Sequence, residues 1–192
     1  MNNAPGRWPP QSGLAREPAT ARLLDLAKWL TALPSDTTLQ HACDRTVQEL
    51  ADVLEVELGK VLIPERDGTL LTIVSGVGWD PDVIGTERVR ATPTSQAGYA
   101  LTVEGPVIFE NLTGTKRFSD AALLRRHGVV SGVTYGLKCD GRVLGVLSVH
   151  SRARRRFTEK EVDLIEHVGV ALAGALARLG SDTFGSDTVA SS

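Results

Sequence analysis

The sequence is poor in cysteine, in net charge and in long apolar runs. Its 2 cysteines, Cys43 and Cys139, lie too far apart for the ligand spacings of zinc or iron–sulfur sites, so we expect no metal. The formal charge of −2, from 21 basic and 23 acidic residues, argues against nucleic acid or an anionic membrane as a partner. No apolar run approaches the roughly 20 residues of a membrane span, and the N-terminus lacks the apolar core of a secretory signal. We therefore expect a cytoplasmic protein with reduced thiols.

The composition that remains is that of an ordinary globular domain, with 42% apolar and 23% charged residues. A chain of 192 residues suits one domain, which can bury a core without disulfides. Residues 1–18 are rich in Pro, Gly and Asn, residues 181–192 are similarly polar, and neither segment has apolar periodicity. This pattern predicts a single domain over 19–180 between two disordered tails.

Apolar periodicity and turn residues predict eleven elements in the order α-α-β-β-β-α-β-α-β-β-α. The expected helices cover 19–33, 37–54 (starting after Ser35 and Asp36), 95–103, 119–127 with Ser119 as N-cap, and a last helix that begins at the capping box of Thr158 and Glu161. The expected strands cover 56–64, 69–77, 87–91, 106–110 and a hairpin over 129–151. This order describes an α+β fold, with a central, mostly antiparallel sheet. The N- and C-terminal helices cover one face, and short helices and loops cover the other.

The hairpin over 129–151 is the clearest local unit. Its Asp140-Gly141 loop favours a type I′ turn, in which both residues need a positive φ. An uninterrupted ladder from this turn places His150 on the same face as Tyr135. The other face then carries Gly132 and Gly136, and bare glycines let a second element approach the backbone closely.

Four segments of the C-terminal half form a recognisable series: GYALTVEGPVIFENL, KRFSD, GVVSGVTYGLKCDGRVLGVLSVHS and RRRFTEKEVDLIEHVGVALAGAL. The series resembles the GAF domain, a small-molecule sensor of signalling proteins, and the resemblance extends over residues 20–179. It implies a non-catalytic sensory domain that binds its ligand between the sheet and the short helices. The lining residues that it implies are Val74, Trp79, Tyr99, Phe109, Phe118, Leu124, His127 and Tyr135. These residues predict a mostly apolar ligand with some polar anchoring.

The motifs of the ligand-specific GAF branches are incomplete, so the cofactor and the ligand stay unknown at this stage. The cyclic-nucleotide signature is matched by Asn111, Lys116, Phe118 and Asp120, but its Asp-Glu pair is missing. Haem-binding relatives use a pocket histidine, which keeps His127 and His150 as candidates.

The two cysteines decide the enzymatic alternative. One GAF branch reduces free methionine sulfoxide, and that chemistry needs a nucleophilic thiolate with a resolving thiol close by. Cys43 lies in the apolar stripe of the second helix and Cys139 adjoins the hairpin turn, so neither matches the cysteines of that branch or of the bilin-binding branch. We expect a buried, inert Cys43 and no catalytic residue.

Two surface features bear on partners. The basic pairs 116–117 and 125–126 border the expected pocket and are either solvated or in contact with an anionic ligand, while Arg152 and 154–156 are expected to be solvated.

The terminal helices carry Leu23, Leu26 and Leu30 and a stripe of Gly169, Ala173 and Ala177, which predict a homodimer with an output through a partner protein. In the alternative, these helices cover the sheet of one subunit. A second rival function is a structural or interaction module, whose pocket Trp79, Tyr99 and Phe118 fill.

Overall fold

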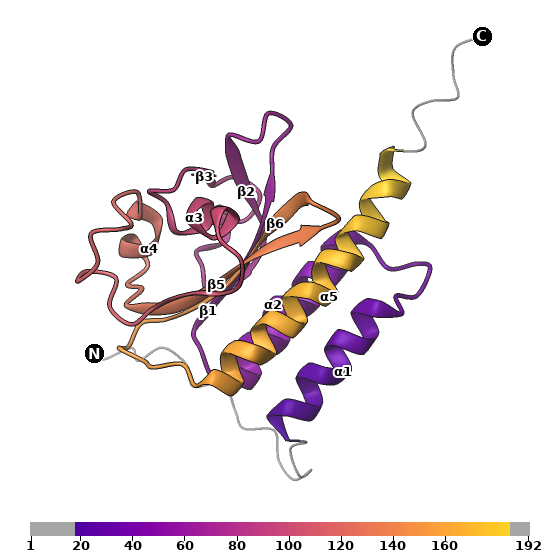
Figure 1. Ribbon diagram of the computed structural model, residues 1–192, viewed down its shortest axis with the longest axis horizontal. Coiled ribbons are helices and arrows are strands. Elements are labelled where there is room, and N and C mark those ends of the chain that lie inside the picture. Colours follow the sequence, from indigo (N-terminus) through magenta and orange to yellow (C-terminus); the bar gives the residue numbers. More distant parts are fainter. Residues whose placement is uncertain (1–17, 185–192) are drawn as a thin grey trace, which may run out of the picture.

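The computed structural model describes residues 18–184, in which a six-stranded antiparallel sheet separates two layers of helices and loops (Figure 1). Along the chain lie α1 (Ala19–Thr31), α2 (Leu39–Leu54), β1 (Leu58–Pro64), β2 (Leu70–Val77), the 3-10 turn η1 (Pro81–Val83), β3 (Arg88–Arg90), α3 (Gln96–Thr102), β4 (Val107–Phe109), α4 (Ala122–Arg126), β5 (Ser131–Cys139), β6 (Arg142–Ser151) and α5 (Glu159–Phe184). The strand order is β3-β2-β1-β6-β5-β4. This architecture confirms the predicted α+β fold.

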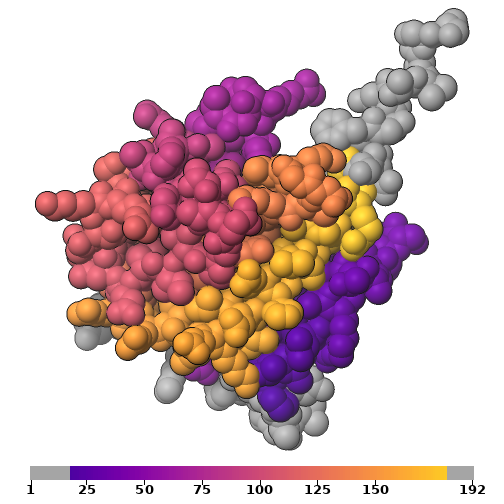
Figure 2. All heavy atoms as spheres, in the orientation of Figure 1, coloured from indigo at the N-terminus to yellow at the C-terminus, as the bar shows by residue number. Residues whose placement is uncertain are grey.

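The three long helices share one side of the sheet. Helices α2 and α5 lie directly on the strands, and α1 packs outside them against both (Figure 1). In Figure 2, α1 in indigo lies along α5 in yellow. The short helices α3 and α4 and the loop after β2 cover the opposite side. None of the described helices is both long and apolar enough to cross a membrane.

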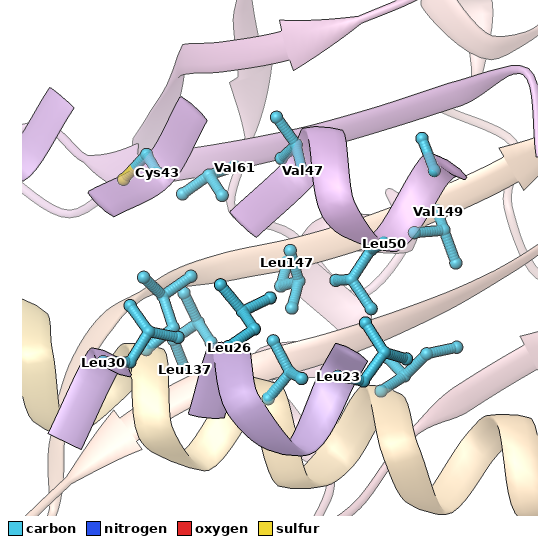
Figure 3. Close-up of a cluster of buried hydrophobic side chains, with 14 of the residues drawn as sticks. Leu23, Leu26, Leu30, Cys43, Val47, Leu50, Val61, Leu137, Leu147 and Val149 are labelled. Carbon is cyan, nitrogen blue, oxygen red and sulfur yellow. The ribbon is translucent and has the colours of Figure 1, made fainter. Parts of the chain in front are cut away.

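Apolar side chains from α1, α2 and α5 fill the space between these helices and the sheet (Figure 3). Leu23, Leu26 and Leu30 recur at helical spacing on α1, and each is at most 1% exposed. A Cβ added at Gly169 of α5 would collide with the ring of Tyr135, so the missing side chain admits that ring. These residues, from which the sequence predicts a dimer contact, are therefore buried inside one chain.

Cys43 of α2 belongs to this core, beside Val61 of β1 (Figure 3). Its side chain is fully buried, and burial raises the pKa of the thiol to about 12. A thiol with so high a pKa supplies almost no thiolate at neutral pH and is inert. The prediction of a buried structural cysteine is confirmed.

The hairpin contains an irregularity that the sequence analysis missed. The turn itself is confirmed, since Asp140 and Gly141 have φ values of 50° and 74°. Two pairs beyond it, the register skips Leu144, which is a β-bulge of one extra residue in β6. Every later residue of β6 is thereby turned over, and His150 pairs with Gly132. The prediction that His150 shares a face with Tyr135 is wrong.

Two helix ends also differ from their predictions. Helix α4 has Ala121 as its N-cap instead of Ser119. The reason is that the Asp120 amide donates to the Thr94 carbonyl, which holds the preceding segment outside the helix. Helix α5 continues to Phe184, so the tail predicted from residue 181 starts at least four residues too early. Extending an existing helix needs no new nucleus, and no proline stops it there. The predicted N-terminal tail lies outside the described residues except for Pro18.

The start of α5 matches its predicted capping box. The Thr158 hydroxyl accepts from the Glu161 amide at 3.3 Å, and a Glu161 carboxylate oxygen accepts from the Thr158 amide at 2.8 Å. Thr158→Ala removes one of these bonds and is expected to lower the free energy of unfolding by about 1 kcal/mol. Chemical denaturation of both proteins measures the difference.

Thr31→Ala is the matched control, because the Thr31 hydroxyl is exposed and bonds only to the Ala27 carbonyl inside its own helix. We expect a change within about 0.5 kcal/mol for this control. Equal losses in the two variants would show that the capping box contributes nothing specific.

Candidate functional site

The face of the sheet opposite the long helices carries a second apolar cluster, formed with α3, α4 and the loops. Six of the eight predicted lining residues lie on this face: Trp79, Tyr99, Phe109, Phe118, Leu124 and His127. The aromatic rings pack on one another, with Phe118 lying edge-on 6.0 Å from both Tyr99 and Phe109. These rings form a packed aromatic cluster on this face of the sheet.

Val74 and Tyr135 lie on the other face, against the long helices. Strand β2 has its own bulge, in which the register with β1 skips Val74. Val74 therefore packs with the helix core, and its carbonyl accepts from the Gln40 side chain of α2 at 3.0 Å. The Tyr135 ring occupies the space left by Gly169. These two residues are thus separated by the sheet from the other six.

Polar side chains form a buried row on the ligand-side face, across the three central strands. Lys60 of β1 pairs with Ser148 of β6, which pairs with Thr134 of β5. The Thr134 hydroxyl donates to Ser148 at 3.0 Å and accepts from the side-chain amide of Gln96 on α3. All four side chains are buried. A buried polar network of this kind is stable only when its members satisfy one another.

His150 joins the same network from the next position of β6. Its Nε2 donates to Gln96 Oε1 at 3.1 Å, the tautomer that lets the Gln96 amide nitrogen face Thr134. Burial, helped by the charge of Lys60, lowers the pKa of His150 well below its usual value, so the ring is neutral. Its Nδ1 is the one buried side-chain nitrogen or oxygen without a hydrogen-bond partner among the described residues. Gly132 makes room for the ring, because a Cβ there would lie 2.7 Å from it.

Lys60 is the most unusual member of the row. It is 3% exposed, and its ammonium lies 4.6 Å from the centre of the Trp79 ring. Within residues 18–184, its Nζ has neither a hydrogen bond nor an ion pair, but unlike His150 Nδ1 it is not fully enclosed, because Lys60 lines a cavity. Burial lowers the pKa of Lys60 to about 7, although the charge of Glu87 opposes the shift. A buried lysine without a counter-ion is costly, and such groups gather at functional sites.

A cavity of about 130 Å³ opens beside Lys60. It is lined by Lys60, Glu87, Arg88, Val89, Arg90, Gln96, Ala97, Asp120, Ala121, Ala122, Leu123 and Leu124. Of the six predicted residues on this face, Leu124 is thus in the lining itself. Both charge signs are present, so the open space is more polar than the sequence analysis expected.

Trp79 covers the row from the loop after β2. Its indole nitrogen donates to the Gly59 carbonyl at 2.8 Å, and its ring stands edge-on to that of His127 at 4.9 Å. His127 in turn faces the Asp80 carboxylate, with 3.1 Å between Nε2 and Oδ2. The loop and the end of α4 are therefore joined through side chains rather than through strands.

Two arginines of the predicted solvated cluster hold loops together. Arg152 is exposed, yet its guanidinium donates to the carbonyls of His127 at 3.0 Å and Gly78 at 3.1 Å. Arg155 donates to the Leu54 carbonyl at the end of α2. Both arginines bind backbone carbonyls of distant segments, a role that the charges in the sequence do not predict.

Four residues of the site, Lys60, Gln96, Thr134 and Ser148, were not predicted from the sequence. Lys60 offered a signal, as a single charge inside the apolar strand of residues 58–64. Gln96 and Thr134 offered none, because their meeting depends on how α3 lies on the sheet. No three His, Cys, Asp or Glu side chains within the described part of the chain are close enough to hold a metal ion.

Solved structures with the same fold come from several kinds of protein. The GAF domain of a phosphoenolpyruvate-protein phosphotransferase from Acinetobacter is 17% identical, with a TM-score of 0.73 over 88% of this chain and 99% of that one. The corresponding domain from Coxiella burnetii is 15% identical, with a TM-score of 0.75 over 86% and 98%. Free methionine-R-sulfoxide reductase from Neisseria meningitidis, in complex with its substrate, is 14% identical, with a TM-score of 0.69 over 88% and 97%. At these identities the likeness shows the fold alone.

Sequence comparison carries the assignment further. No curated protein matches the chain. The family model of the GAF domain, however, matches residues 38–176, which run from the start of α2 to the last buried turns of α5 and include the whole sheet. This match, over most of the chain, shows that the chain belongs to the GAF domain family.

Proposed function

We propose that this chain is a non-catalytic sensory or regulatory domain. In this proposal it binds a small molecule in the cavity between the sheet and helices α3 and α4. The observation that carries it is the Lys60 ammonium, which ends a buried side chain at the cavity and has no hydrogen-bond or ion-pair partner among the described residues. A domain with only a structural role gains nothing from such a group, because an apolar side chain there is less costly.

Strand β5 supplies a route from the cavity to the long helices. On the cavity side, a Cβ at Gly136 would lie 2.6 Å from the Ala100 carbonyl oxygen, so α3 rests directly on the strand. On the other side, the neighbouring Tyr135 packs against Gly169 of α5. A ligand that moves α3 would press on β5, and β5 on α5. Signalling of this kind requires that the ligand bind the two states with different affinities.

The absence of catalysis is part of the proposal. Neither cysteine borders the cavity, since Cys43 lies in the helix-side core and Cys139 at the tip of the hairpin. The reductase activity named for the Neisseria protein therefore has no thiol pair to support it here.

A cytoplasmic location and a homodimer are secondary parts of the proposal. Both cysteines are free, as expected in a reducing compartment. With the leucine stripe of α1 buried, a dimer through terminal helices would use exposed apolar residues such as Leu24 and Val170, which are 41% and 57% exposed. Light scattering during gel filtration measures the dimer directly.

The test is a search for a ligand with the purified 192-residue chain. At least one member of a metabolite library is expected to raise the melting temperature, because a ligand at 100 times its Kd adds about 2.7 kcal/mol of stability. Native mass spectrometry of the same preparation should show the added mass. If no compound shifts the melting temperature and no bound mass is found, the rival structural module, whose aromatic side chains fill the pocket, is the better description.

A further inference from the structure

We propose that the ligand carries an anionic group, a carboxylate or a phosphate, that pairs with the Lys60 ammonium at the buried end of the cavity. This inference rests on the proposed function and names the chemical class of its ligand.

The charges around the cavity single out Lys60 as the anchor. Two of the charged lining residues already have partners, since Glu87 pairs with Arg126 at 3.1 Å and Arg88 with Glu65 at 2.8 Å. Of the other charged lining residues, Arg90 and Asp120 are exposed, so water solvates them. Lys60 alone is both buried and without a counter-ion among the described lining residues.

An anionic ligand would supply the counter-ion that Lys60 lacks among the described residues. A buried ion pair is formed at a desolvation cost, but removing or omitting one partner is far more costly. Bonds between an ammonium and a carboxylate or phosphate are also roughly twice as strong as those between neutral groups. The Trp79 ring below the ammonium favours its charged form as well. The free energy of binding would therefore include the relief of an unpaired charge.

The hydrogen-bond network beside Lys60 also favours a ligand with oxygen acceptors. The bonds run in one direction, from His150 to Gln96, from Gln96 to Thr134 and from Thr134 to Ser148. The Ser148 hydroxyl thus accepts a bond and keeps its own hydrogen to donate, with no acceptor among the described residues. It ends the chain of donors beside Lys60, its partner in the ladder. Of these two donors only Lys60 lines the cavity, and its ammonium suits a ligand that brings oxygens.

The negative side chains of the site do not oppose this assignment. Glu87 pairs with Arg126, and the lining holds three cations, Lys60, Arg88 and Arg90, against the two anions Glu87 and Asp120. The cavity is small, so the anionic group belongs to a compact metabolite or is itself the ligand.

The test uses matched probes that differ only in charge. Succinate and propionate are compared with succinamide and propionamide, and inorganic phosphate is added as a separate arm, by calorimetry on the full chain. We expect an acid to bind at least ten times more tightly than its amide, or phosphate to bind. Binding of the acids identifies a carboxylate ligand, and binding of phosphate alone identifies a phosphate ligand.

Variants connect the binding to one residue. Lys60→Met keeps the length of the side chain and is expected to weaken the anion at least tenfold, whereas Lys116→Met, outside the cavity lining, leaves it unchanged. Wild-type protein labelled with 15N-lysine gives a readout that needs no variant, because the Lys60 side-chain signal should shift with the bound anion and the Lys116 signal should not.

The outcomes separate this inference from the proposed function. If a neutral compound from the library binds and Lys60→Met leaves its affinity intact, the sensor stands and the anionic ligand is refuted. Amide probes that bind as tightly as the corresponding acids would also refute the anionic ligand and leave the sensor function standing. If neither the probes nor the library binds, both proposals fail together.

Discussion

Lys60→Met is expected to make the protein more stable at pH 7 and to remove a rise in stability above that pH. Burial lowers the pKa of Lys60 from 10.5 to about 7. Between these two values the unfolded chain holds a proton on Lys60 that the folded chain has released, so the free energy of unfolding increases with pH. The penalty of burial is complete below pH 7 and is relieved as the pH approaches 10.5.

The size of this effect makes it easy to measure. Each pH unit in the window adds about 1.4 kcal/mol, so wild-type protein should gain roughly 2–3 kcal/mol between pH 7 and pH 9 relative to Lys60→Met. Urea denaturation at several pH values gives the difference between the two proteins. His150 titrates below this window, since its pKa is lowered, and does not disturb the comparison.

Lys116→Met is again the control, because the Lys116 side chain is exposed. Its stability should run parallel to that of wild type at every pH. A constant difference between wild type and Lys60→Met across the window would mean that Lys60 stays protonated when folded. The protein would then already contain a counter-ion for it.

Gly78→Ala is expected to cost at least about 3 kcal/mol of stability, and this second large effect tests the loop that carries Trp79. Gly78 has a φ of 77°, and a Cβ there would overlap the carbonyl oxygen of Glu57 and lie 3.0 Å from its carbonyl carbon. Both strain and collision therefore oppose the alanine. Because the next residue is Trp79, its fluorescence should also change.

Gly85→Ala separates the cost of backbone strain from the cost of steric collision. Gly85 has a nearly equal φ of 79°, but a Cβ there meets nothing within 4 Å. Its loss should be only the roughly 1–2 kcal/mol of a left-handed alanine. The excess in Gly78→Ala, measured by denaturation, is the cost of the close approach between the loop and β1. Equal losses would show that the backbone around Glu57 gives way.

The sequence predicted those parts of the fold that depend on near neighbours. The capping box of α5 and the Asp140-Gly141 turn are short patterns whose geometry does not depend on distant contacts, and both were confirmed. The two bulges, at Val74 and Leu144, were missed because an extra apolar residue in an apolar strand leaves the pattern unchanged.

The site was predicted only in part for the same reason. Aromatic residues such as Phe109 and Phe118 could be assigned to the ligand face from the order of elements. The network could not, because Gln96 reaches Thr134 and His150 only once α3 lies on Gly136 of β5. Tertiary contacts of this kind have no periodic signature in the sequence.

The bulge at Leu144 determines which face of the sheet each later residue of β6 lies on. Beyond it, Ser148 and His150 lie on the face of the sheet that α3 covers, while Leu147 and Val149 face the long helices. In a relative whose strand is one residue shorter at this point, the same residues would exchange sides, and an apolar surface would replace the polar row. The polarity of this face of the sheet, beside the cavity, thus depends on the number of residues in β6 as well as on their identity. An alignment that misplaces a single gap here would equate His150 with a core valine.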